Sequence, residues 1–390
     1  MEEIDVAIVG GGPSGLQAAI SLARKGHSPI VFEEHPIIGQ PIQCGEGISL
    51  NALEEFDLVK KSKSFVVREY ENCKIYFPSN DVIMGDIHSY TINRDIFDQH
   101  LAKEAQRAGA EVKLSSKING AYKKNESIII KTTSEKKQEY KCEMLILAEG
   151  PQGRLASNLG FSPPSPLISA FEYRVEGEWG DTLEFYFDKE KYPFGYCWIF
   201  PKKGETNVGI VTTAKERKTR LDRFLEEKKI TGKKIKMVGG QIPMNGPSNK
   251  LYDKQIMLVG DAAGMVNPIF YGGIRLAMLS GKIAGEVAAT NLERKENEFS
   301  YSCKEYESKL KKYEFMKKVN LKCHNSFYGF SNKSLSKIGT IFNNKYINRI
   351  EKLEKLEIFW KILKNPSISR KIKDLYYMYR GFKIARDWGF

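Results

Sequence analysis

The chain has 390 residues, of which 41% are hydrophobic, so it is long enough to form two domains or one large elaborated domain. Its 61 Lys and Arg residues outnumber its 48 Asp and Glu residues, which gives a formal net charge of +13. No apolar run approaches the ~18 residues of a membrane span, and the first strand pattern begins at the N-terminus. We therefore expect a cytoplasmic protein with no membrane-crossing helix and no signal peptide.

Cysteine and histidine do not form a metal-binding pattern. The six Cys residues contain no C-x-x-C pair, and the five His residues are scattered without ligand-like spacing. We expect isolated thiols, mostly buried, and no metal site.

The first predicted element is an apolar strand over residues 5–9 that leads into a glycine-rich turn and then a helix. The turn has the G-x-G-x-x-G pattern of nucleotide-binding βαβ units, in which the glycines permit a tight turn, close approach of the backbone to a pyrophosphate, and close helix packing. The N-terminus of the following helix offers N–H groups and a positive dipole end to phosphate. The candidate cofactor-binding residues of this turn are Gly10, Gly12, Pro13, Ser14 and Gly15.

A second strand over residues 28–32 ends at Glu33, eighteen residues after Gly15. At this distance a carboxylate accepts hydrogen bonds from the ribose hydroxyls of a dinucleotide. Glu34 is the neighbouring alternative for the ribose, and its other interpretation is a solvated surface charge.

The middle of the chain alternates between two kinds of pattern. A helix and several strands return to the nucleotide-binding domain, at residues 94–109, 111–115, 127–132 and 144–148. Short alternating or aromatic-rich runs predict antiparallel strands elsewhere, at residues 65–92 and 167–211. A charged stretch over residues 215–236 predicts an exposed helix and its following turn.

A second glycine-rich signature, residues 258–264, predicts a short buried strand followed by a turn and a helix. It lies about 250 residues after the first signature. Together the two signatures indicate FAD rather than NAD, and a chemistry that the flavin itself carries out.

The C-terminal part, residues 304–390, alternates lysines with aromatic and aliphatic residues at helical spacing. It therefore predicts several amphipathic helices. A basic amphipathic surface suits anionic lipid or nucleic acid, and the other interpretation is solvated lysine-rich helix faces. No recognition motif accompanies the charge, so we expect no nucleic-acid partner, while peripheral contact with the inner face of a membrane stays open.

Four segments resemble a known family: the first signature with Glu33, the Cys-Gly-Glu-Gly-Ile-Ser segment at residues 44–49, residues 93–98, and residues 192–201, which contain P-x-G-Y-x-W-x-F-P. With these segments, residues 1–300, and more loosely the rest, resemble the geranylgeranyl reductase family of FAD enzymes within the p-hydroxybenzoate-hydroxylase-like fold. Within that family, the resemblance is closest to the archaeal digeranylgeranylglycerophospholipid reductases. The last segment is the most specific, because Rossmann flavoenzymes in general lack it.

The resemblance implies an α/β protein with a Rossmann-type FAD-binding domain, an inserted antiparallel-sheet substrate domain and a C-terminal helical region. We expect the FAD-binding domain to comprise residues 1–64, 93–160 and 252–300. The β-rich substrate domain would comprise residues 65–92 and 161–251, and the helical region residues 301–390.

The resemblance also assigns cofactor contacts. Cys44, Gly45 and Gly47 would line the flavin, Arg94 would reach it, and Ala121 would offer backbone contacts on the adenine side. Two further contacts lie in an Ala-Glu-Gly segment where relatives carry Ala-Asp-Gly, at Ala148 and Gly150.

The second signature continues to the flavin ring. Asp261 would bind the ribityl or pyrophosphate region, and Gly272, Gly273 and Ile274 would present backbone N–H groups near the pyrimidine edge. The family usually has a third glycine where this chain has Tyr271. We expect the larger side chain to narrow or reshape the pocket, which puts the size of the substrate in question.

The implied reaction saturates double bonds of geranylgeranyl chains in isoprenoid (archaeal ether) lipids or their precursors, an oxidoreduction of CH–CH groups in membrane lipid biosynthesis. One carbon receives a hydride and the other a proton, in a site that excludes water.

The candidate proton donors are Cys44, Glu46 and Tyr196, of which the Cys44 loop is favoured for its proximity to the flavin. Aromatic walls would bind the prenyl chain, although each residue is equally interpretable as core, at Phe185, Phe187, Tyr196, Trp198, Phe200 and Tyr271.

The sequence does not identify the electron donor, and it leaves two alternative functions open. No second G-x-G-x-x-G marks a dedicated NAD(P)H domain, so ferredoxin, NAD(P)H or reduced flavin can each serve, and a positive surface attracts an acidic ferredoxin or anionic headgroups. One alternative is a flavin monooxygenase or halogenase, because residues 196–201 share the spacing of the W-x-W-x-I-P halogenase segment but lack its first Trp. The other is a catalytically inactive flavin-bound lipid-binding protein.

Overall fold

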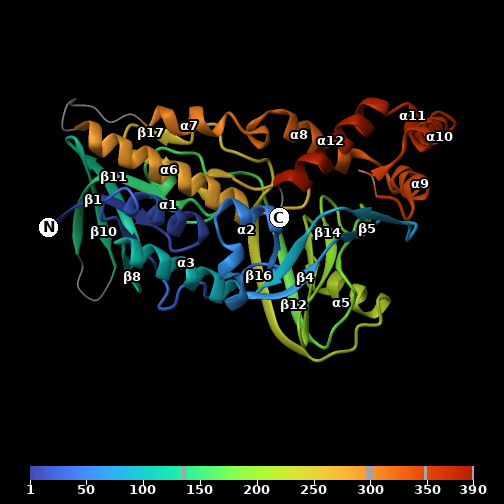
Figure 1. Cartoon of the computed structure of the whole chain (residues 1–390), viewed down its shortest axis with the longest axis horizontal. Helices are drawn as coiled ribbons and strands as arrows, with labels where there is room; N and C mark the ends of the chain where they lie inside the picture. Colours follow the sequence, from blue (N-terminus) through green and yellow to red (C-terminus); the bar gives the residue numbers. More distant parts are fainter. Residues whose placement is uncertain (134–137, 296–302, 347–348, 389–390) are drawn as a thin grey trace. The chain divides into compact units, whose positions relative to one another are not determined.

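The computed structural model describes residues 1–133, 138–295, 303–346 and 349–388, and it divides into two compact units. Unit 1 comprises Met1–Ile42, Arg94–Leu167 and Ile242–Lys317. Unit 2 comprises Gln43–Asn93, Ile168–Gln241 and Lys318–Phe390. Each unit is thus assembled from three separate stretches of the chain, as the sequence colours of Figure 1 show.

Unit 1 is built on a largely parallel sheet in the order β17-β18-β11-β1-β2-β8, with β10 and β9 added beside β11. β2, β18 and the C-terminal halves of β1 and β11 are apolar and buried, as expected where helices cover a parallel sheet, whereas the edge strand β8 is partly exposed. Their bounds are β1 (Glu2–Val9), β2 (Ile30–Phe32), β8 (Glu111–Lys113), β11 (Glu139–Leu147) and β18 (Ile256–Leu258). Antiparallel strands complete it: β17 (Tyr252–Asp253), β9 (Ile118–Lys124) and β10 (Ser127–Thr132).

Two helices of unit 1, α1 (Pro13–Ala23) and α6 (Ile274–Lys295), lie side by side (Figure 1). Glycine makes this possible: a Cβ at Gly281 of α6 would overlap the carbonyl oxygen of Ser14, and a Cβ at Gly285 would lie 2.5 Å from that of Ala18. The other helical segments of the unit are α3 (Arg94–Ala108), α4 (Arg154–Asn158), η2 (Gly260–Ala263), α7 (Lys304–Leu310) and η3 (Glu314–Met316).

Unit 2 contains a seven-stranded sheet in the order β16-β12-β15-β14-β13-β5-β6 and a three-stranded sheet in the order β3-β7-β4. The larger sheet is antiparallel at every register pair described except β13 with β5. Its strands are β16 (Lys234–Pro243), β12 (Leu167–Glu176), β15 (Glu205–Thr212), β14 (Tyr196–Pro201), β13 (Leu183–Tyr186), β5 (Cys73–Tyr76) and β6 (Val82–Gly85). The smaller sheet consists of β3 (Gly47–Ser49), β7 (Ser89–Ile92) and β4 (Val66–Tyr70).

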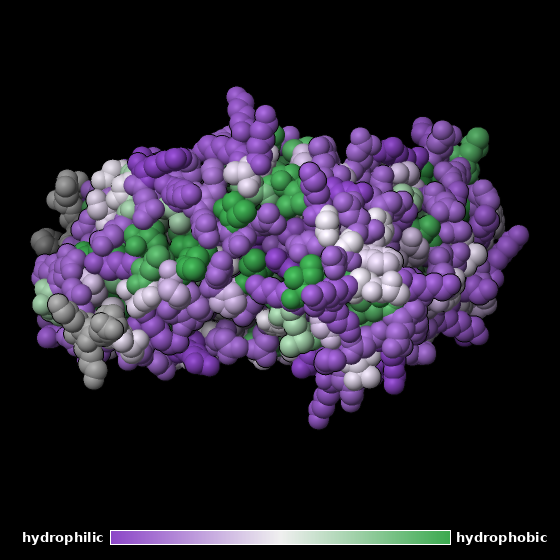
Figure 2. Space-filling view, turned by 90° about the horizontal axis from the view of Figure 1, so that it is seen from below, coloured by the Kyte–Doolittle hydropathy of each residue, from purple (hydrophilic) through white to green (hydrophobic). Residues whose placement is uncertain are grey.

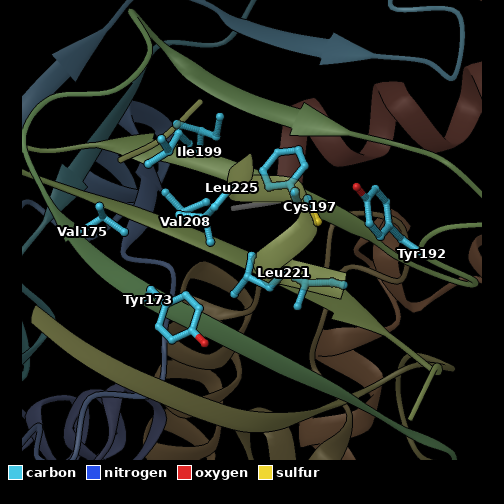
Figure 3. Packing of buried hydrophobic residues seen from close by; sticks show 11 residues of the cluster. Tyr173, Val175, Tyr192, Cys197, Ile199, Val208, Leu221 and Leu225 are labelled. Atoms are coloured by element: carbon cyan, nitrogen blue, oxygen red, sulfur yellow. The ribbon is translucent and has the colours of Figure 1, made fainter. Parts of the chain in front are cut away.

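The large sheet of unit 2 buries one face against helix α5 (Arg217–Glu227). Because side chains alternate along a strand, Cys197 and Ile199 of β14 point to this face together with Val208 of β15. Figure 3 shows these residues packed against Leu221 and Leu225 of the helix. The alternate side chains of β14 therefore belong to the opposite face.

The remaining helices of unit 2 are α2 (Leu50–Glu55), η1 (Val59–Ser64), α8 (Val319–Gly329), α9 (Asn332–Phe342), α10 (Lys352–Leu363), α11 (Pro366–Ser369) and α12 (Ile372–Trp388). Phe327 of α8 packs edge-to-face on Phe187, with ring centroids 4.9 Å apart, and on Phe382 of α12 at 5.4 Å. Among the described residues, no helix is long and apolar enough to cross a membrane. Hydrophilic residues dominate the face of the molecule drawn in Figure 2, in keeping with a chain that is 28% charged.

The structure has the predicted α/β class, but its compact units have other bounds than the predicted domains. Residues 43–64 belong to unit 2, because β3 pairs with β7 along Gly47–Ser49. The predicted C-terminal region is divided: Tyr306 of α7 donates a hydrogen bond to the carbonyl of Leu258 in unit 1 (2.7 Å), whereas helices α8–α12 pack in unit 2.

Candidate active site

The first glycine signature forms a tight turn between β1 and α1 in unit 1. Gly10 has φ 109°, and a Cβ there would overlap the carbonyl oxygen of Ala148. A Cβ at Gly15 would overlap the carbonyl of Gly10, whereas one at Gly12 would meet nothing within 4 Å. Open space at Gly12 therefore adjoins the N-terminus of α1, whose N-cap provides no side-chain hydrogen bond. This arrangement fits a phosphate group.

Glu33 follows β2 and reaches this turn. Its Oε2 accepts a hydrogen bond from the backbone N–H of Gly11 (2.7 Å), and its Oε1 accepts one from the N–H of His35 (2.9 Å). Glu34 instead pairs with Lys117 at the surface, and this hydrogen bond lowers its pKa. The geometry therefore favours Glu33 over Glu34 as the ribose ligand.

The two glycine signatures meet in unit 1 although they are far apart in sequence. A Cβ at Gly260 would lie 2.5 Å from Ser14 Oγ, and the N–H of Gly260 donates to Ser280 Oγ in α6 (2.9 Å). The Ala148–Gly150 segment ends β11 beside the same turn, with the N–H of Ala148 donating to the carbonyl of Val9 (2.8 Å).

Two further residues hold defined positions: Glu149, which lies between the predicted contacts Ala148 and Gly150, and the predicted contact Ala121. Glu149 accepts hydrogen bonds from the N–H groups of Leu155 (2.8 Å) and Ala156 (2.7 Å) and so caps α4. Ala121 lies opposite Ile130 in β9, which has β10 as its only partner among the described strands.

Asp261 and Arg94 form the charged part of this site. Burial raises the pKa of Asp261 to about 6, and the Arg94 guanidinium opposes this shift. Arg94 donates to both carboxylate oxygens of Asp98, through Nε (3.0 Å) and Nη2 (2.9 Å). A Cβ at Gly273 would lie 3.4 Å from Asp261 Oδ1, so the carboxyl group lies next to the glycines that precede α6.

The turn before α6 is held by Asn267, a buried residue that the sequence analysis did not single out. Its Oδ1 accepts from the N–H groups of Ile269 (2.8 Å) and Phe270 (3.1 Å). Its backbone N–H donates to the carbonyl of Gly272 (2.9 Å). Tyr271 has φ 54°, a left-handed backbone conformation that glycine adopts more readily than tyrosine.

In unit 2, the predicted aromatic walls share one face of the large sheet. Phe185 lies opposite Trp198 in the register of β13 and β14, so the alternate residues follow on the same side. Phe185 is 5.5 Å from Tyr196 and 5.2 Å from Phe200 between ring centroids, and Phe187 is 5.1 Å from Tyr196. All five are buried. Tyr271 differs from them in belonging to unit 1.

The Cys44–Gly47 loop lies on this aromatic face. A Cβ at Gly45 would be 3.3 Å from ring atoms of both Phe200 and Trp198, and one at Gly47 would be 3.5 Å from Phe200. Cys44 Sγ accepts the N–H of Glu46 (3.2 Å). A side chain at Gly45 would therefore press on both rings, whereas a Cβ at Gly47 would make an ordinary van der Waals contact.

Glu46 fastens the loop through a fully buried carboxylate. Its Oε2 accepts from Arg174 Nη2 (2.7 Å), Lys202 Nζ (2.8 Å) and Asn207 Nδ2 (2.9 Å). Asn207 also donates to the carbonyl of Gly45 (3.2 Å). None of these three donors was predicted from the sequence. Two of them did carry a signal, because Lys202 directly follows the apolar strand β14 and Asn207 is a polar residue within β15.

Glu172 is a second buried carboxyl group on this face that the sequence analysis missed. In the strand register, Glu172 and Trp198 both lie opposite Gly209, where a Cβ would overlap the indole. Neither oxygen of Glu172 has a hydrogen-bond partner among the described residues. The Trp198 N–H favours the carboxylate electrostatically but does not reach hydrogen-bond geometry.

Burial raises the pKa of Glu172 well above its usual range, and the negative charge of Glu46 adds to this shift. Arg174 and Lys202 oppose it. The raised pKa favours the protonated form of Glu172 beside Trp198, next to a loop held by the hydrogen-bonded carboxylate of Glu46.

Two family models match the chain. Residues 5–160 match the FAD dependent oxidoreductase family model, and residues 169–242 match the geranylgeranyl reductase catalytic domain. A digeranylgeranylglycerophospholipid reductase from Thermoplasma acidophilum is 32% identical, over 96% of this chain and 100% of the relative. One from Methanopyrus kandleri is 31% identical, over 96% and 99%.

Solved structures agree with this relationship. A geranylgeranyl bacteriochlorophyll reductase-like protein from Thermoplasma acidophilum has a TM-score of 0.85 and 31% identity, over 96% of this chain and 100% of that one. A flavin-dependent brominase, at 16% identity and a TM-score of 0.65 over 97% and 94%, shares the fold alone. The matches confirm the predicted family resemblance, fold class and FAD cofactor.

The raised pKa of Asp261 predicts pH-dependent binding of FAD. A hydrogen bond from a cofactor hydroxyl favours the carboxylate, so binding lowers the pKa from about 6 and releases a proton. The affinity of the apoprotein should therefore rise with pH up to about 6, then level off, with about a tenfold loss between pH 7 and pH 5. Fluorescence titration with FAD measures this, and Asp261→Asn should flatten the dependence. An equal slope in that variant would contradict the assignment.

The buried cluster around Glu46 predicts an asymmetric stability effect at two adjacent lysines. Lys202→Met leaves a buried carboxylate short of a cation and should cost about 3 kcal/mol. Lys203→Met is the matched control, because Lys203 is exposed, and should change stability by less than about 0.5 kcal/mol. Urea unfolding at neutral pH compares the two, and equal stabilities would show that Lys202 does not hold the cluster.

Proposed function

We propose that this chain, which belongs to the digeranylgeranylglycerophospholipid reductase family, saturates double bonds in the geranylgeranyl chains of isoprenoid glycerolipids or of their precursors. It is an FAD-dependent oxidoreductase by the family models it matches. The observation that supports the proposal most directly is the glycine loop of residues 44–47 fastened over an aromatic sheet face. The aromatic residues of this face and the donors that hold the loop lie within residues 169–242, which match the reductase catalytic domain.

The residues of unit 1 fit FAD by their chemistry. Open space at Gly12 and the free end of α1 suit the pyrophosphate, Glu33 suits the ribose, and Asp261 suits a ribityl hydroxyl. When bound, FAD supplies the hydride for one carbon of the double bond. We assign its binding to Gly10, Gly12, Pro13, Ser14, Gly15, Glu33, Arg94, Ala121, Ala148, Gly150, Asp261, Gly272, Gly273 and Ile274, with Cys44, Gly45 and Gly47 contributed by the loop.

The aromatic face of unit 2 suits the hydrocarbon part of the substrate. Each buried CH₂ group of a prenyl chain contributes about 0.8 kcal/mol, and aromatic walls exclude water from the reacting carbons. Phe185, Tyr196 and Trp198 would bind the chain together with Phe187 and Phe200. Tyr271 belongs to unit 1, and its effect on the size of the accepted substrate stays a prediction.

The second carbon of the double bond needs a proton, and Glu172 is suited to supply it. Glu46 is a poor donor, because three hydrogen bonds favour its charged form. Cys44 and Tyr196 stay candidates by position. The raised pKa of Glu172 favours its protonated form, and the residue lies on the aromatic face. Arg174 and Lys202 would stabilise the carboxylate that remains after proton transfer. Water restores the proton before the next turnover.

Glu172→Gln should lower the rate of alkene reduction about 100-fold or more, because a general acid contributes at least that factor. Reduction of the flavin by dithionite should stay unchanged, since it does not use this proton. Rapid mixing of the reduced enzyme with substrate separates the two steps. Glu176→Gln, an exposed residue of the same strand, is the control and should behave as wild type. Unchanged alkene reduction in Glu172→Gln would remove Glu172 as donor.

The proposed function is tested by anaerobic turnover. Dithionite-reduced enzyme is mixed with a geranylgeranylated glycerolipid or geranylgeranyl diphosphate, and the product is analysed by mass spectrometry. We expect two hydrogens gained per double bond, with reoxidation of the flavin. Flavin that stays reduced until oxygen is admitted would instead support a monooxygenase or halogenase, and flavin that never turns over would support a lipid-binding protein without activity.

Two partners complete the proposal. The net charge of +13 favours an acidic reduced ferredoxin as the electron donor, with NAD(P)H or free reduced flavin as the alternatives. The substrate is a lipid, so we also propose peripheral contact with the inner face of the membrane.

A further inference from the structure

Helix α10 exposes large apolar side chains along one side. Leu353 is 80% exposed, Leu356 59%, Trp360 59% and Leu363 39%, and their spacing of three, four and three residues places them in one stripe. Phe359, 47% exposed, lies beside this stripe. We call these five residues the outer face of α10.

The exposure of this stripe does not arise from a loosely packed helix. Ile358 and Ile362 of the same helix are 7% and 8% exposed, and they lie about half a turn away from the stripe. The helix therefore buries one apolar side in unit 2 and leaves a second, larger one in solvent. Soluble proteins rarely expose such contiguous apolar surface unless it binds something.

A second helix of unit 2 repeats the pattern. Along α12, Ile372, Tyr376 and Tyr379 are about half exposed and spaced by four and three residues, while Met378 and Ile384 are buried. Tyr and Trp side chains combine an apolar ring with a polar group, which suits the boundary between water and lipid.

The charges around these helices are mainly positive. Residues 349–388 contain eleven Lys and Arg against five Asp and Glu, so this short stretch carries nearly half of the net charge of +13. Glu357 is paired with Lys361 (2.6 Å) and Glu354 with Lys345. Lys352 and Lys364, at the two ends of α10, have no acidic partner among the described residues.

We propose that the outer face of α10 is a docking surface for an anionic lipid bilayer. Leu353, Leu356 and Trp360 would enter the boundary between headgroups and acyl chains, and Lys352 and Lys364 would contact headgroup phosphates. A second copy of the chain is disfavoured, because two lysine-flanked faces would repel each other. The outer face of α10 would thus make the membrane contact of the proposed function, on which this inference rests. It would bring a reductase of membrane lipids to its substrate.

The test is flotation of the FAD-loaded protein with vesicles of phosphatidylcholine alone or with phosphatidylglycerol added. We expect binding to the anionic vesicles that weakens with salt, and at least a tenfold loss of binding in the double variant Leu356→Gln/Trp360→Gln. The matched control is Ile235→Gln/Met237→Gln, which removes two equally exposed apolar side chains from β16 of the same unit and should bind as wild type.

Two further readouts keep the outcome clear. Thermal unfolding and turnover of geranylgeranyl diphosphate, a substrate in solution, should be unchanged in the α10 variant, because these residues lie outside the proposed catalytic residues. Wild-type protein that ignores anionic vesicles, or an α10 variant that binds them normally, would overturn the docking surface. Concentration-dependent dimers that vanish in the α10 variant, without vesicle binding, would overturn it in favour of a second copy. Failure of prenyl reduction with intact vesicle binding would reject the enzyme function alone.

Discussion

The buried carboxylate of Glu46 is the constraint on which the proposed substrate side of this enzyme depends. A charge without solvent is stable only if several donors satisfy it, and here Arg174, Lys202 and Asn207 share one oxygen. Glu46 also has φ 65°, so its backbone is held in a left-handed conformation inside the loop. These contacts keep the glycines of the loop against Trp198 and Phe200, where the loop cannot drift without leaving a buried charge unpaired.

The same cluster determines the state of Glu172. Two carboxyl groups close to one set of cations cannot both be charged at low cost, and the one with the hydrogen bonds keeps the charge. Glu46 takes all three donors, and the pKa of Glu172 is raised by burial and by Glu46 itself. Separation of two carboxyl groups into a charged and a neutral member is a general way for a protein to obtain an acid at neutral pH. The structural role of Glu46 and the chemical role of Glu172 are therefore linked.

Much of the fold followed from local patterns, and most of what was missed depends on tertiary contacts. The glycine turn before α1 and the position of Glu33 could be predicted because each follows from a short motif. Glu172 could not, because a charged residue in a strand looks like a surface residue until its neighbours are known. Lys202 directly follows the apolar strand β14, so its position was a signal, but its partner Glu46 was not predictable. Residues 43–64 were predicted as part of the FAD-binding domain, whereas the compact units group them in unit 2. The reason is the pairing of β3 with β7, which joins segments about forty residues apart. The amphipathic pattern predicted α10, but not that its larger apolar side would face solvent.

The central claim is that a neutral carboxylic acid lies on the aromatic face of unit 2, and infrared difference spectroscopy tests it most directly. Spectra at neutral pH are compared between wild type and Glu172→Gln, with Glu176→Gln as the reference for an ordinary exposed carboxylate. We expect Glu172→Gln, but not Glu176→Gln, to remove the C=O stretching band of a protonated carboxylic acid. Loss of only carboxylate bands in both variants would show that Glu172 is charged, and it would contradict the account.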